Sequence, residues 1–356
     1  MNSTMLAVQL VEWRSGPQLR EVPVPTPSGA EVLVAVEAAG LCHTDIRVVE
    51  SGPELFGYEL PMTLGHEVCG TVVQTARAAD AQWLGRRVVV HGIWGCGECR
   101  NCVRGRENYC LRLGRDSSGR HLPIGGGLGH NGGLAQAMVV PSVRHLVPAG
   151  DLTPAQSAPL ADAGLTAYHA INECSDLIDP STVAAVIGVG GLGHLAVQIL
   201  RDLGAGTVVA VDNRDQAVAL AREVGAHRAG RTLHEALGPA ADADLIFDFV
   251  GSTETMSQAQ SMLGPGGRLS VVGGAGGRLE VGKSPAMAPG WSVSAPFWGS
   301  AAELSAVVAI GARDGIRSEV TCYGLDRAIE AFDRLRAGEV TGRVVLLPPA
   351  WSYATG

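Results

Sequence analysis

The sequence is poor in charged and aromatic residues and has no long uninterrupted hydrophobic run. Charged residues make up 17% of the 356 positions and aromatic residues 4%, whereas roughly 25% of an average soluble protein is charged. The formal net charge is −8. An acidic chain without clustered lysine and arginine has no surface suited to neutralising phosphates, so we expect no nucleic-acid partner.

No segment has the features of an export signal or a membrane helix. The most apolar stretch, residues 183–200, contains His194, Gln198 and four glycines and is too polar to cross a bilayer. The residues before Arg14 include no basic group and no long apolar run. Eight cysteines in such a chain are more typical of metal binding or chemistry than of disulfides. We expect a cytoplasmic globular protein with no membrane partner.

Glycine is the abundant residue, and the chain is long enough for more than one domain. The 48 glycines are about 13% of the sequence, roughly twice the usual share. Glycine and proline together stay below the roughly 25–30% that marks disordered segments. At about 150 residues per domain the length predicts two or three domains.

The two halves of the chain have different patterns. Residues 1–153 contain short valine-rich runs bounded by Gly, Pro or Ser, which predict a mostly β domain with an antiparallel, partly closed sheet. Residues 94–131 interrupt these runs as a long loop that contains four cysteines, and we expect it to be functional. Residues 154–297 form the second predicted domain, and residues 298–356 form a C-terminal segment with two helices and a strand at 343–347.

The second domain alternates apolar strand runs with helical spacing. Strands are predicted at residues 183–189, 207–211, 244–250, 268–272 and 293–298. Apolar residues recur at helical spacing over 192–203 and 217–224. Unbroken apolar strands indicate burial on both faces, so we expect an α/β fold with a doubly wound parallel sheet covered by helices.

A glycine-rich G-x-G-x-x-G loop joins the first of these strands to its helix. The loop contains Gly188, Gly190, Gly191, Leu192 and Gly193. Such a loop turns tightly, lets the backbone approach a pyrophosphate and presents a helix N-terminus to it. Asp212 follows 19 residues after Gly193, where an acid binds ribose hydroxyls. This pattern predicts NAD binding.

Two features leave alternatives open at this site. A carboxylate at Asp212 repels the 2′-phosphate of NADP, but Arg214 lies two residues further on and can accept it. A glycine-rich turn without any ligand, followed by an aspartate that only caps a loop, is the other interpretation of the motif. The strand, the helix and the acid in register favour the cofactor site.

Four cysteines lie within 15 residues of the long loop. They are Cys96, Cys99, Cys102 and Cys110. Four thiolates can enclose one tetrahedral zinc ion with no open position, which is typical of a structural site. The first three also resemble the start of an iron–sulfur run, but the final spacing of seven residues and the following leucine do not fit that pattern.

A second set of candidate ligands is dispersed along the chain. Cys42 lies in AGLCHTDI with Thr44 and Asp45, His66 and Glu67 lie in LGHE, and Asp162 lies in PLADAGLTAY. A thiolate, an imidazole and a carboxylate could form a three-ligand zinc site with an open fourth position, the catalytic arrangement. Each residue alone is more often a packing residue, and the spacing does not show that they meet.

These motifs together resemble a known family. AGLCHTD, GHE-x2-G, the four-cysteine loop, PLADAGLTAYHA and GVGGLG occur in the order found in zinc-dependent medium-chain alcohol dehydrogenases. The resemblance extends over essentially the whole chain and is closest to bacterial NAD-dependent secondary-alcohol dehydrogenases in which the third catalytic ligand is aspartate. It implies a Rossmann domain, a GroES-like catalytic domain to which residues 298–356 return, and a homodimer or homotetramer.

The resemblance also implies a role for each site residue. Catalytic zinc would lie on Cys42, His66 and Asp162 with Glu67 beside it, and structural zinc on the four loop cysteines, so two zinc ions per chain. Thr44 would pass on the substrate proton, and Asp45 would orient His66. Arg343 would lie on the cofactor phosphates. Trp94 and Trp298 are candidates for the wall of the substrate pocket, and each alone is more typical of ordinary core.

One position departs from the family pattern. Many members carry a histidine five residues after the first ligand cysteine, at the end of the proton relay, and here that residue is Arg47. Arginine stays charged and cannot act as a base. The relay then ends in solvent or at His43, and we expect His43 to contact the cofactor phosphates instead.

The sequence thus predicts a zinc-dependent oxidoreductase that transfers hydride between a secondary alcohol or ketone and NAD. A metal-free quinone or enoyl reductase of the same fold and a catalytically silent NAD-binding protein are the alternatives. The presence of Cys42, Thr44, His66 and Asp162 together argues against both. The spacing does not identify the substrate, and it does not place the segment Phe56-Gly57-Tyr58 at the site.

Overall fold

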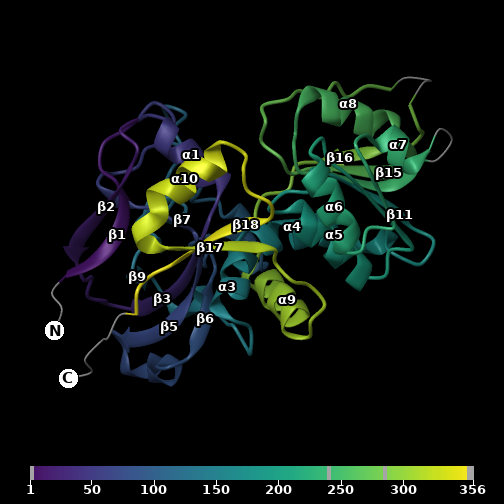
Figure 1. Cartoon of the computed structure of the whole chain (residues 1–356). Coiled ribbons are helices and arrows are strands. Elements are labelled where there is room, and N and C mark those ends of the chain that lie inside the picture. Colours follow the sequence, from purple (N-terminus) through teal and green to yellow (C-terminus); the bar gives the residue numbers. More distant parts are fainter. Residues whose placement is uncertain (1–3, 239–241, 284–286, 351–356) are drawn as a thin grey trace. The chain divides into compact units, whose positions relative to one another are not determined.

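The chain forms two compact units. The structure is a computed structural model that describes residues 4–238, 242–283 and 287–350. The first unit comprises Met1–Asp162, Gly299–Ala312 and Val320–Gly356, and the second unit comprises Ala163–Trp298 and Arg313–Glu319. The chain leaves the first unit after Asp162 and returns to it at Gly299 (Figure 1). By their contacts residues 154–162 pack in the first unit, although our proposed domain boundary precedes them.

The first unit is built on a seven-stranded sheet with the strand order β10-β6-β5-β3-β18-β17, in which β9 also pairs with β3. A three-stranded sheet, β2-β1-β4, and the short pair β7-β8 complete it. The strands are β1 Thr4–Leu10, β2 Pro17–Pro23, β3 Val32–Leu41, β4 Met62–Thr63, β5 Glu67–Thr75, β6 Arg87–Val90, β7 Gly125–Gly126, β8 Gly129–His130, β9 Ala137–Val140, β10 Leu146–Pro148, β17 Val320–Gly324 and β18 Arg343–Leu347.

Most strand pairs in this unit are antiparallel, as the pattern predicts. The exceptions are β17 with β18, which are parallel because α10 (Ala328–Arg336) connects them, and the short pair β7 and β8. β3 lies in the middle of the large sheet, and its Val32, Leu33 and Val34 are fully buried. The segment from β17 to β18 thereby joins a sheet built mainly from the first 150 residues.

The other helices of the first unit are short except for one. They are α1 His43–Glu50, α2 Arg100–Val103, α3 Pro154–Ser157 and α9 Ala301–Ala312. α1 begins two residues after β3 ends, and the 3-10 helix η4 (Ala158–Ala161) ends just before Asp162. The ends of β3 and η4 and the start of β5 therefore bring three distant parts of the sequence to one region of the first unit.

The second unit contains a six-stranded sheet in which every pair is parallel. The strand order is β13-β12-β11-β14-β15-β16. The strands are β11 Val183–Ile187, β12 Thr207–Val211, β13 Arg228–Gly230, β14 Ala243–Asp248, β15 Leu263–Val271 and β16 Ser292–Ser294. The helices are α4 Ala163–Asn172, α5 Gly193–Asp202, α6 Asp215–Glu223, α7 Leu233–Leu237 and α8 Thr253–Ser261.

This order is that of the doubly wound dinucleotide-binding fold. In that fold the chain adds strands first on one side of its first strand and then on the other side. Here that first strand is β11, with β12 on one side and β14 on the other. The predicted parallel sheet is confirmed. The last strand is shorter than predicted, because the strand expected at 293–298 is only Ser292–Ser294. Pro296 follows two residues later and cannot donate a backbone hydrogen bond to the sheet.

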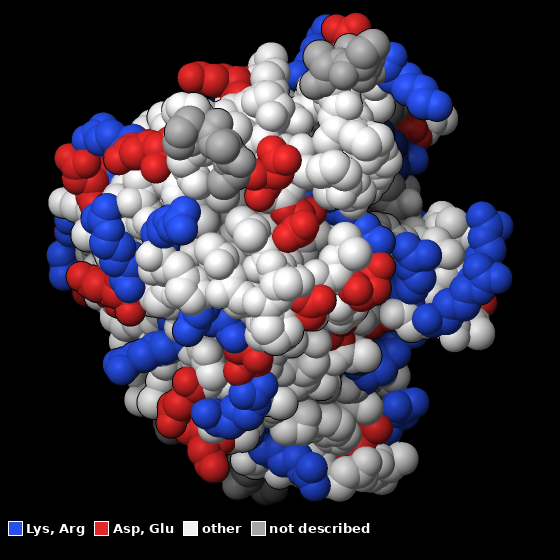
Figure 2. Space-filling model, turned by 90° about the vertical axis from the view of Figure 1, so that its right-hand side faces the viewer, with Lys and Arg blue, Asp and Glu red and all other residues white. Residues whose placement is uncertain are grey.

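On one face of the molecule (Figure 2), charged side chains leave much of the surface uncovered. On the face drawn in Figure 2, basic and acidic side chains are intermingled and separated by broad uncharged areas. Within the described residues, no helix combines the length and the apolar character needed to span a bilayer.

Candidate active site and metal centres

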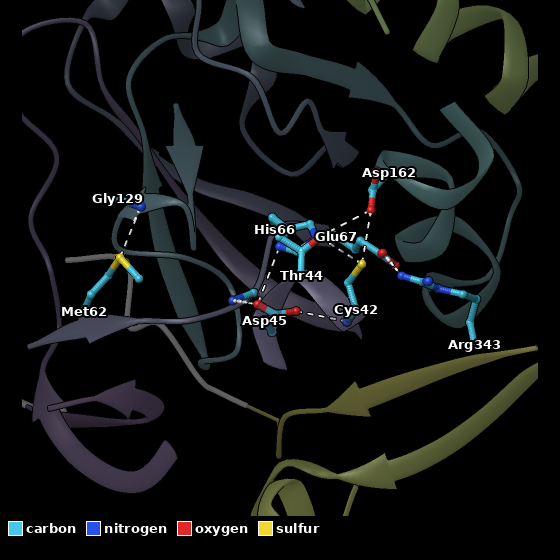
Figure 3. Close-up of polar contacts among 10 residues, drawn as sticks. Cys42, Thr44, Asp45, Met62, His66, Glu67, Gly129, Asp162 and Arg343 are labelled. Carbon is cyan, nitrogen blue, oxygen red and sulfur yellow. Dashed lines mark hydrogen bonds and ion pairs between the residues drawn. The ribbon is translucent and has the colours of Figure 1, made fainter. Parts of the chain in front are cut away.

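Four candidate ligands from three segments of the first unit converge at one point. Cys42 follows β3, His66 and Glu67 stand at the start of β5, and Asp162 follows η4 (Figure 3). One ligand atom from each lies within 4.8 Å of the others. All four residues are buried. The structure therefore brings together the residues that the sequence could only name separately.

The distances among these donors fit a tetrahedral metal ion. Zinc bonds of about 2.3 Å to sulfur and about 2.0–2.2 Å to nitrogen or oxygen place tetrahedral donors roughly 3.4–3.6 Å apart. Oδ2 of Asp162 lies 3.5 Å from Sγ of Cys42 and 3.5 Å from Nε2 of His66. The donor set and its spacing thus fit zinc without rearrangement.

The charges around His66 also favour a bound cation. Burial lowers the pKa of His66, but the charge of Asp45 and the contacts with Asp162, Asp45 and Cys42 outweigh burial and raise this pKa well above its usual range. Buried carboxylates without a compensating charge are costly. Oε2 of Glu67 is buried and has no hydrogen-bond partner among the described residues. A divalent ion at this point would offset that negative charge.

Asp45 holds the two ligand segments in place. It is the third residue of α1, and its Oδ2 accepts a hydrogen bond from the backbone N–H of Cys42 at 3.0 Å. Its Oδ1 accepts from the backbone N–H of Gly65 at 3.1 Å and lies 3.5 Å from Nδ1 of His66. Asp45 is fully buried. One carboxylate therefore fixes the cysteine segment, the histidine segment and the imidazole ring.

Two further residues adjoin the ligands. Oγ1 of Thr44 lies 3.6 Å from Sγ of Cys42. Arg343, the first residue of β18, is 4% exposed and forms an ion pair with Oε1 of Glu67. The family resemblance implied that Arg343 contacts the cofactor phosphates, and it did not predict this partner. His43, the first residue of α1, is exposed.

The four loop cysteines form a second centre in the first unit. Sγ of Cys96 lies 3.9 Å from that of Cys102, and Sγ of Cys99 lies 3.9 Å from that of Cys110. Tetrahedral zinc–thiolate sites separate their sulfurs by about 3.8 Å. Backbone N–H groups donate to these sulfurs, from Cys99 to Cys96 at 3.4 Å and from Leu111 to Cys99 at 3.5 Å. The positions of the four sulfurs therefore fit a four-coordinate zinc ion.

The thiol pKa values agree with that interpretation. Backbone hydrogen bonds from Cys102 and Leu111 lower the pKa of Cys99 to about 6. Burial and the adjacent sulfurs raise the pKa of Cys102. Four neighbouring thiolates repel each other, so all four ionise together only around a cation.

The glycine-rich loop lies in the second unit at the end of β11. Gly188 has φ +86°, a conformation that a residue with a side chain rarely adopts. A Cβ at Gly193 would collide with the carbonyl oxygen of Gly188. At Gly190 the nearest atom to an added Cβ belongs to Arg214, 3.8 Å away, so the space above this glycine is open. The loop has the shape that a pyrophosphate requires.

Asp212 connects the glycine-rich loop to the next strand. Its Oδ2 accepts a hydrogen bond from the backbone N–H of Val189 at 2.9 Å. Its Oδ1 accepts from the backbone N–H and from Nε of Arg214 at 2.9 and 3.2 Å. Arg214, which could have favoured NADP, therefore pairs with Asp212, the carboxylate that repels the 2′-phosphate of NADP.

His194, the second residue of α5, follows this loop and had no predicted role. Its ring is fully buried, and burial lowers its pKa to about 4. Nδ1 lies 2.8 Å from the carbonyl oxygen of Gly190, and Nε2 accepts from the backbone N–H of Glu319 at 3.0 Å. The sequence could have pointed to His194 only through its position directly after Gly193, the last glycine of the motif.

The two tryptophans have different surroundings. The ring of Trp94 stacks on His130 with centroids 5.2 Å apart. It lines a cavity of about 770 Å³ in the first unit, and no metal ligand is among the lining residues. Trp298 is 6% exposed and has φ 55°. A role for either ring in the wall of the substrate pocket stays a prediction.

The chain matches known proteins over most of its length. Residues 28–151 match the family model of the alcohol dehydrogenase GroES-like domain, and residues 191–313 match that of the zinc-binding dehydrogenases. The chain is 32% identical to the D-arabinose 1-dehydrogenase (NADP(+)) of Saccharolobus solfataricus over 93% of this chain and 94% of that protein. It is 29% identical to an NAD-dependent alcohol dehydrogenase of Sulfurisphaera tokodaii over 97% of this chain and all of that protein.

The similar solved structures include the alcohol dehydrogenase of Aeropyrum pernix, with a TM-score of 0.86 and 32% identity over 96% of this chain and all of that one. They also include the acetophenone reductase of Geotrichum candidum in complex with NAD, with a TM-score of 0.84 and 28% identity over 98% of each chain. The chain belongs to the zinc-dependent medium-chain alcohol dehydrogenase family. It is an oxidoreductase that acts on alcohols or carbonyl compounds with a pyridine nucleotide.

Proposed function

We propose that the protein is an NAD-dependent dehydrogenase of secondary alcohols, and a ketone reductase in the reverse direction. A catalytic zinc ion would be held by Cys42, His66 and Asp162, and a structural zinc ion by the four loop cysteines. The observation that carries the proposal is the convergence of a thiol, an imidazole and a carboxylate at tetrahedral donor spacing. When bound, the catalytic zinc supplies a Lewis acid for the substrate oxygen, and NAD supplies the hydride acceptor.

The chain's own residues position the reactants and move the proton. Oγ1 of Thr44, beside Cys42, is the group we assign to accept the proton of the substrate hydroxyl while its own proton passes on to solvent or to His43. Asp45 keeps the ring of His66 in one orientation, which leaves Nε2 directed at Asp162. Glu67 is held by Arg343 next to the ligands, and its second oxygen, which has no hydrogen-bond partner among the described residues, would be available to a bound metal.

The cofactor is proposed to be NAD, bound by Gly188, Gly190, Gly191, Leu192 and Gly193 with Asp212 on the adenosine ribose. His43 and Arg343 are assigned to the cofactor phosphates. For His43 the check is the His43→Ala variant: weaker NADH binding supports the assignment, and unchanged binding with a shifted pH optimum assigns His43 to the proton relay instead.

Replacing Asp212 by Ser should move cofactor preference toward NADP. The variant removes the carboxylate that repels a 2′-phosphate and that now pairs with Arg214, so that Arg214 can bind the phosphate instead. A charge-assisted hydrogen bond of about 1.5–3 kcal/mol predicts a change of roughly 10- to 100-fold in the ratio of kcat/KM for NAD and NADP. Steady-state kinetics with both cofactors measure it, and Asp215→Ser is the control, because this exposed acid begins α6 and pairs with Arg231. An unchanged ratio would remove Asp212 from the cofactor site.

The test of the proposed function is a substrate panel on protein of known zinc content. Small secondary alcohols and ketones, including acetophenone, are supplied with each cofactor, and absorbance of the reduced nicotinamide is followed. Turnover with a full zinc complement is the expected result. Turnover without the catalytic zinc would favour a metal-free quinone or enoyl reductase, and no turnover over a broad panel would favour a silent NAD-binding protein.

We also infer a homo-oligomer and a cytoplasmic location. β16 is an edge strand whose three residues are exposed, and Val293 and Phe297 are 37% and 43% exposed. Edge strands of this kind pair readily with a second chain. A light-scattering mass of two or four times 36.8 kDa is the expected result, and a monomer would contradict it. None of the eight cysteines is paired in a disulfide, as a reducing compartment favours.

A further inference from the structure

Arg47 stands on the same face of α1 as the proton-transfer residue. It follows Thr44 by three residues, a spacing at which helix side chains are neighbours. Thr44 in turn lies 3.6 Å from the sulfur of Cys42, so this face of the helix begins at the metal ligands. The side chain of Arg47 is exposed. A guanidinium in this place cannot accept a proton, so Arg47 cannot act as a base in the proton relay.

The first two glutamates that follow Arg47 in the chain are already paired with other arginines. Glu50, one turn further along α1, accepts from Nε of Arg336 at 2.8 Å. Glu54, in the loop after the helix, is paired with Arg14. Among the described residues no carboxylate forms an ion pair with Arg47. Its charge is therefore not compensated by the part of the chain that the structure describes.

A second arginine and a histidine lie beside Arg47 in the long loop. The backbone N–H of His121 donates to Leu55 at 2.8 Å, and the ring of His121 packs on Phe56 with centroids 5.4 Å apart. Arg115 forms a β-bridge with His121. Burial and the charges of Arg115 and Arg47 lower the pKa of His121, so the charges of both guanidinium groups act on an imidazole that is neutral at pH 7.

Tyr58 completes the group on the side of the metal ligands. Its ring packs on Phe56 with centroids 4.9 Å apart, and it is 8% exposed. Burial raises the pKa of Tyr58 to about 12, while the charges of His66 and Arg47 act to lower it. The phenol is therefore a protonated donor on which the charge of Arg47 acts.

We propose that Arg47, with Arg115, Tyr58 and His121 around it, binds an anionic oxygen group, a carboxylate or a phosphate, next to the site of hydride transfer. A guanidinium fork matches such a group with two parallel hydrogen bonds, and a phenol and a neutral imidazole can add one each. The anion belongs either to the substrate, which would then be a hydroxy acid or a phosphorylated alcohol, or to the cofactor. The placement next to the reacting carbon rests on the proposed function, whereas the binding of an anion does not.

The test compares Arg47→Gln with the wild-type holoenzyme on two matched alcohols. 2-Butanol and 3-hydroxybutyrate have the same four-carbon chain and differ in a terminal methyl or carboxylate. If the substrate carries the anion, the variant loses about 10- to 100-fold in kcat/KM for 3-hydroxybutyrate and stays within about threefold for 2-butanol. If the cofactor carries it, the Kd of NADH measured by fluorescence rises about tenfold and both alcohols are affected equally.

Arg104→Gln is the matched control, because Arg104 is also exposed but stands at the end of α2. If Arg47→Gln behaves like this control in both measurements, the proposal is wrong. Should the wild type oxidise neither alcohol, the proposed function fails, and the anion site is tested separately by calorimetric titration of inorganic phosphate and butyrate. Binding that Arg47→Gln abolishes supports the site, and binding that is absent or equal in both proteins contradicts it.

Discussion

His66→Ala is expected to lower turnover of secondary alcohols by about 10⁴-fold while leaving the cofactor bound as before. A catalytic metal ion stabilises developing charge by several kcal/mol, and each 1.36 kcal/mol is a factor of ten in rate. Without the imidazole, Cys42 and Asp162 provide two ligands, which is too few for a catalytic zinc site. Steady-state kinetics at saturating NAD measure the loss.

Two controls separate this effect from misfolding. The glycine-rich loop lies in the second unit, which contains none of the proposed ligands, so NADH fluorescence should report an unchanged Kd for His66→Ala. His234→Ala, an exposed histidine of α7, should keep wild-type rates. A His66→Ala protein that retains more than about a tenth of the activity would show that His66 holds no essential metal.

Cys99→Ser should remove the structural zinc and destabilise the first unit by several kcal/mol, because a structural zinc site contributes its binding energy to folding. The loss of stability is not confined to the loop. Oε1 of Glu107, inside the cysteine loop, accepts from the backbone N–H of Ala301, the first residue of α9, at 2.6 Å. A loop that loses its metal therefore also loosens the contact with the segment that returns to the first unit.

The expected result is a Tm lower by more than about 10 °C, at roughly 2–4 °C per kcal/mol for a unit of this size. Thermal unfolding followed by circular dichroism measures it. Cys322→Ser is the matched control, because Cys322 is exposed and belongs to neither cluster, and it should leave Tm unchanged. Equal Tm values for the two variants would show that the four-cysteine cluster has no role in stability.

Local patterns in the sequence were enough to predict much of the fold. The glycine-rich loop depends on residues within one strand–turn–helix unit, and Gly188 and Gly193 show the steric reasons for their identity. The four cysteines lie within one loop, so their spacing alone predicted a shared ion, and the structure confirms that their sulfurs converge. Proline at 296 was the local signal that the last strand of the second unit would be short.

Contacts between distant segments could not be derived in this way. Cys42, His66 and Asp162 come from three parts of the chain, and only the resemblance to a family joined them before the structure did. The partner of Glu67 is Arg343, 276 residues away, because β18 returns to the sheet beside β3. The group around Arg47 likewise depends on the long loop packing against residues 55–58. Such pairings are decided by tertiary packing, which spacing does not encode.

The number of zinc ions per chain tests the central claim most directly. Metal analysis of the wild-type protein, of His66→Ala and of Cys99→Ser should give two ions in the first and one in each variant, because the two clusters share no ligand. A wild-type chain with a single zinc ion, or a His66→Ala chain that still holds two, would contradict a catalytic zinc on Cys42, His66 and Asp162.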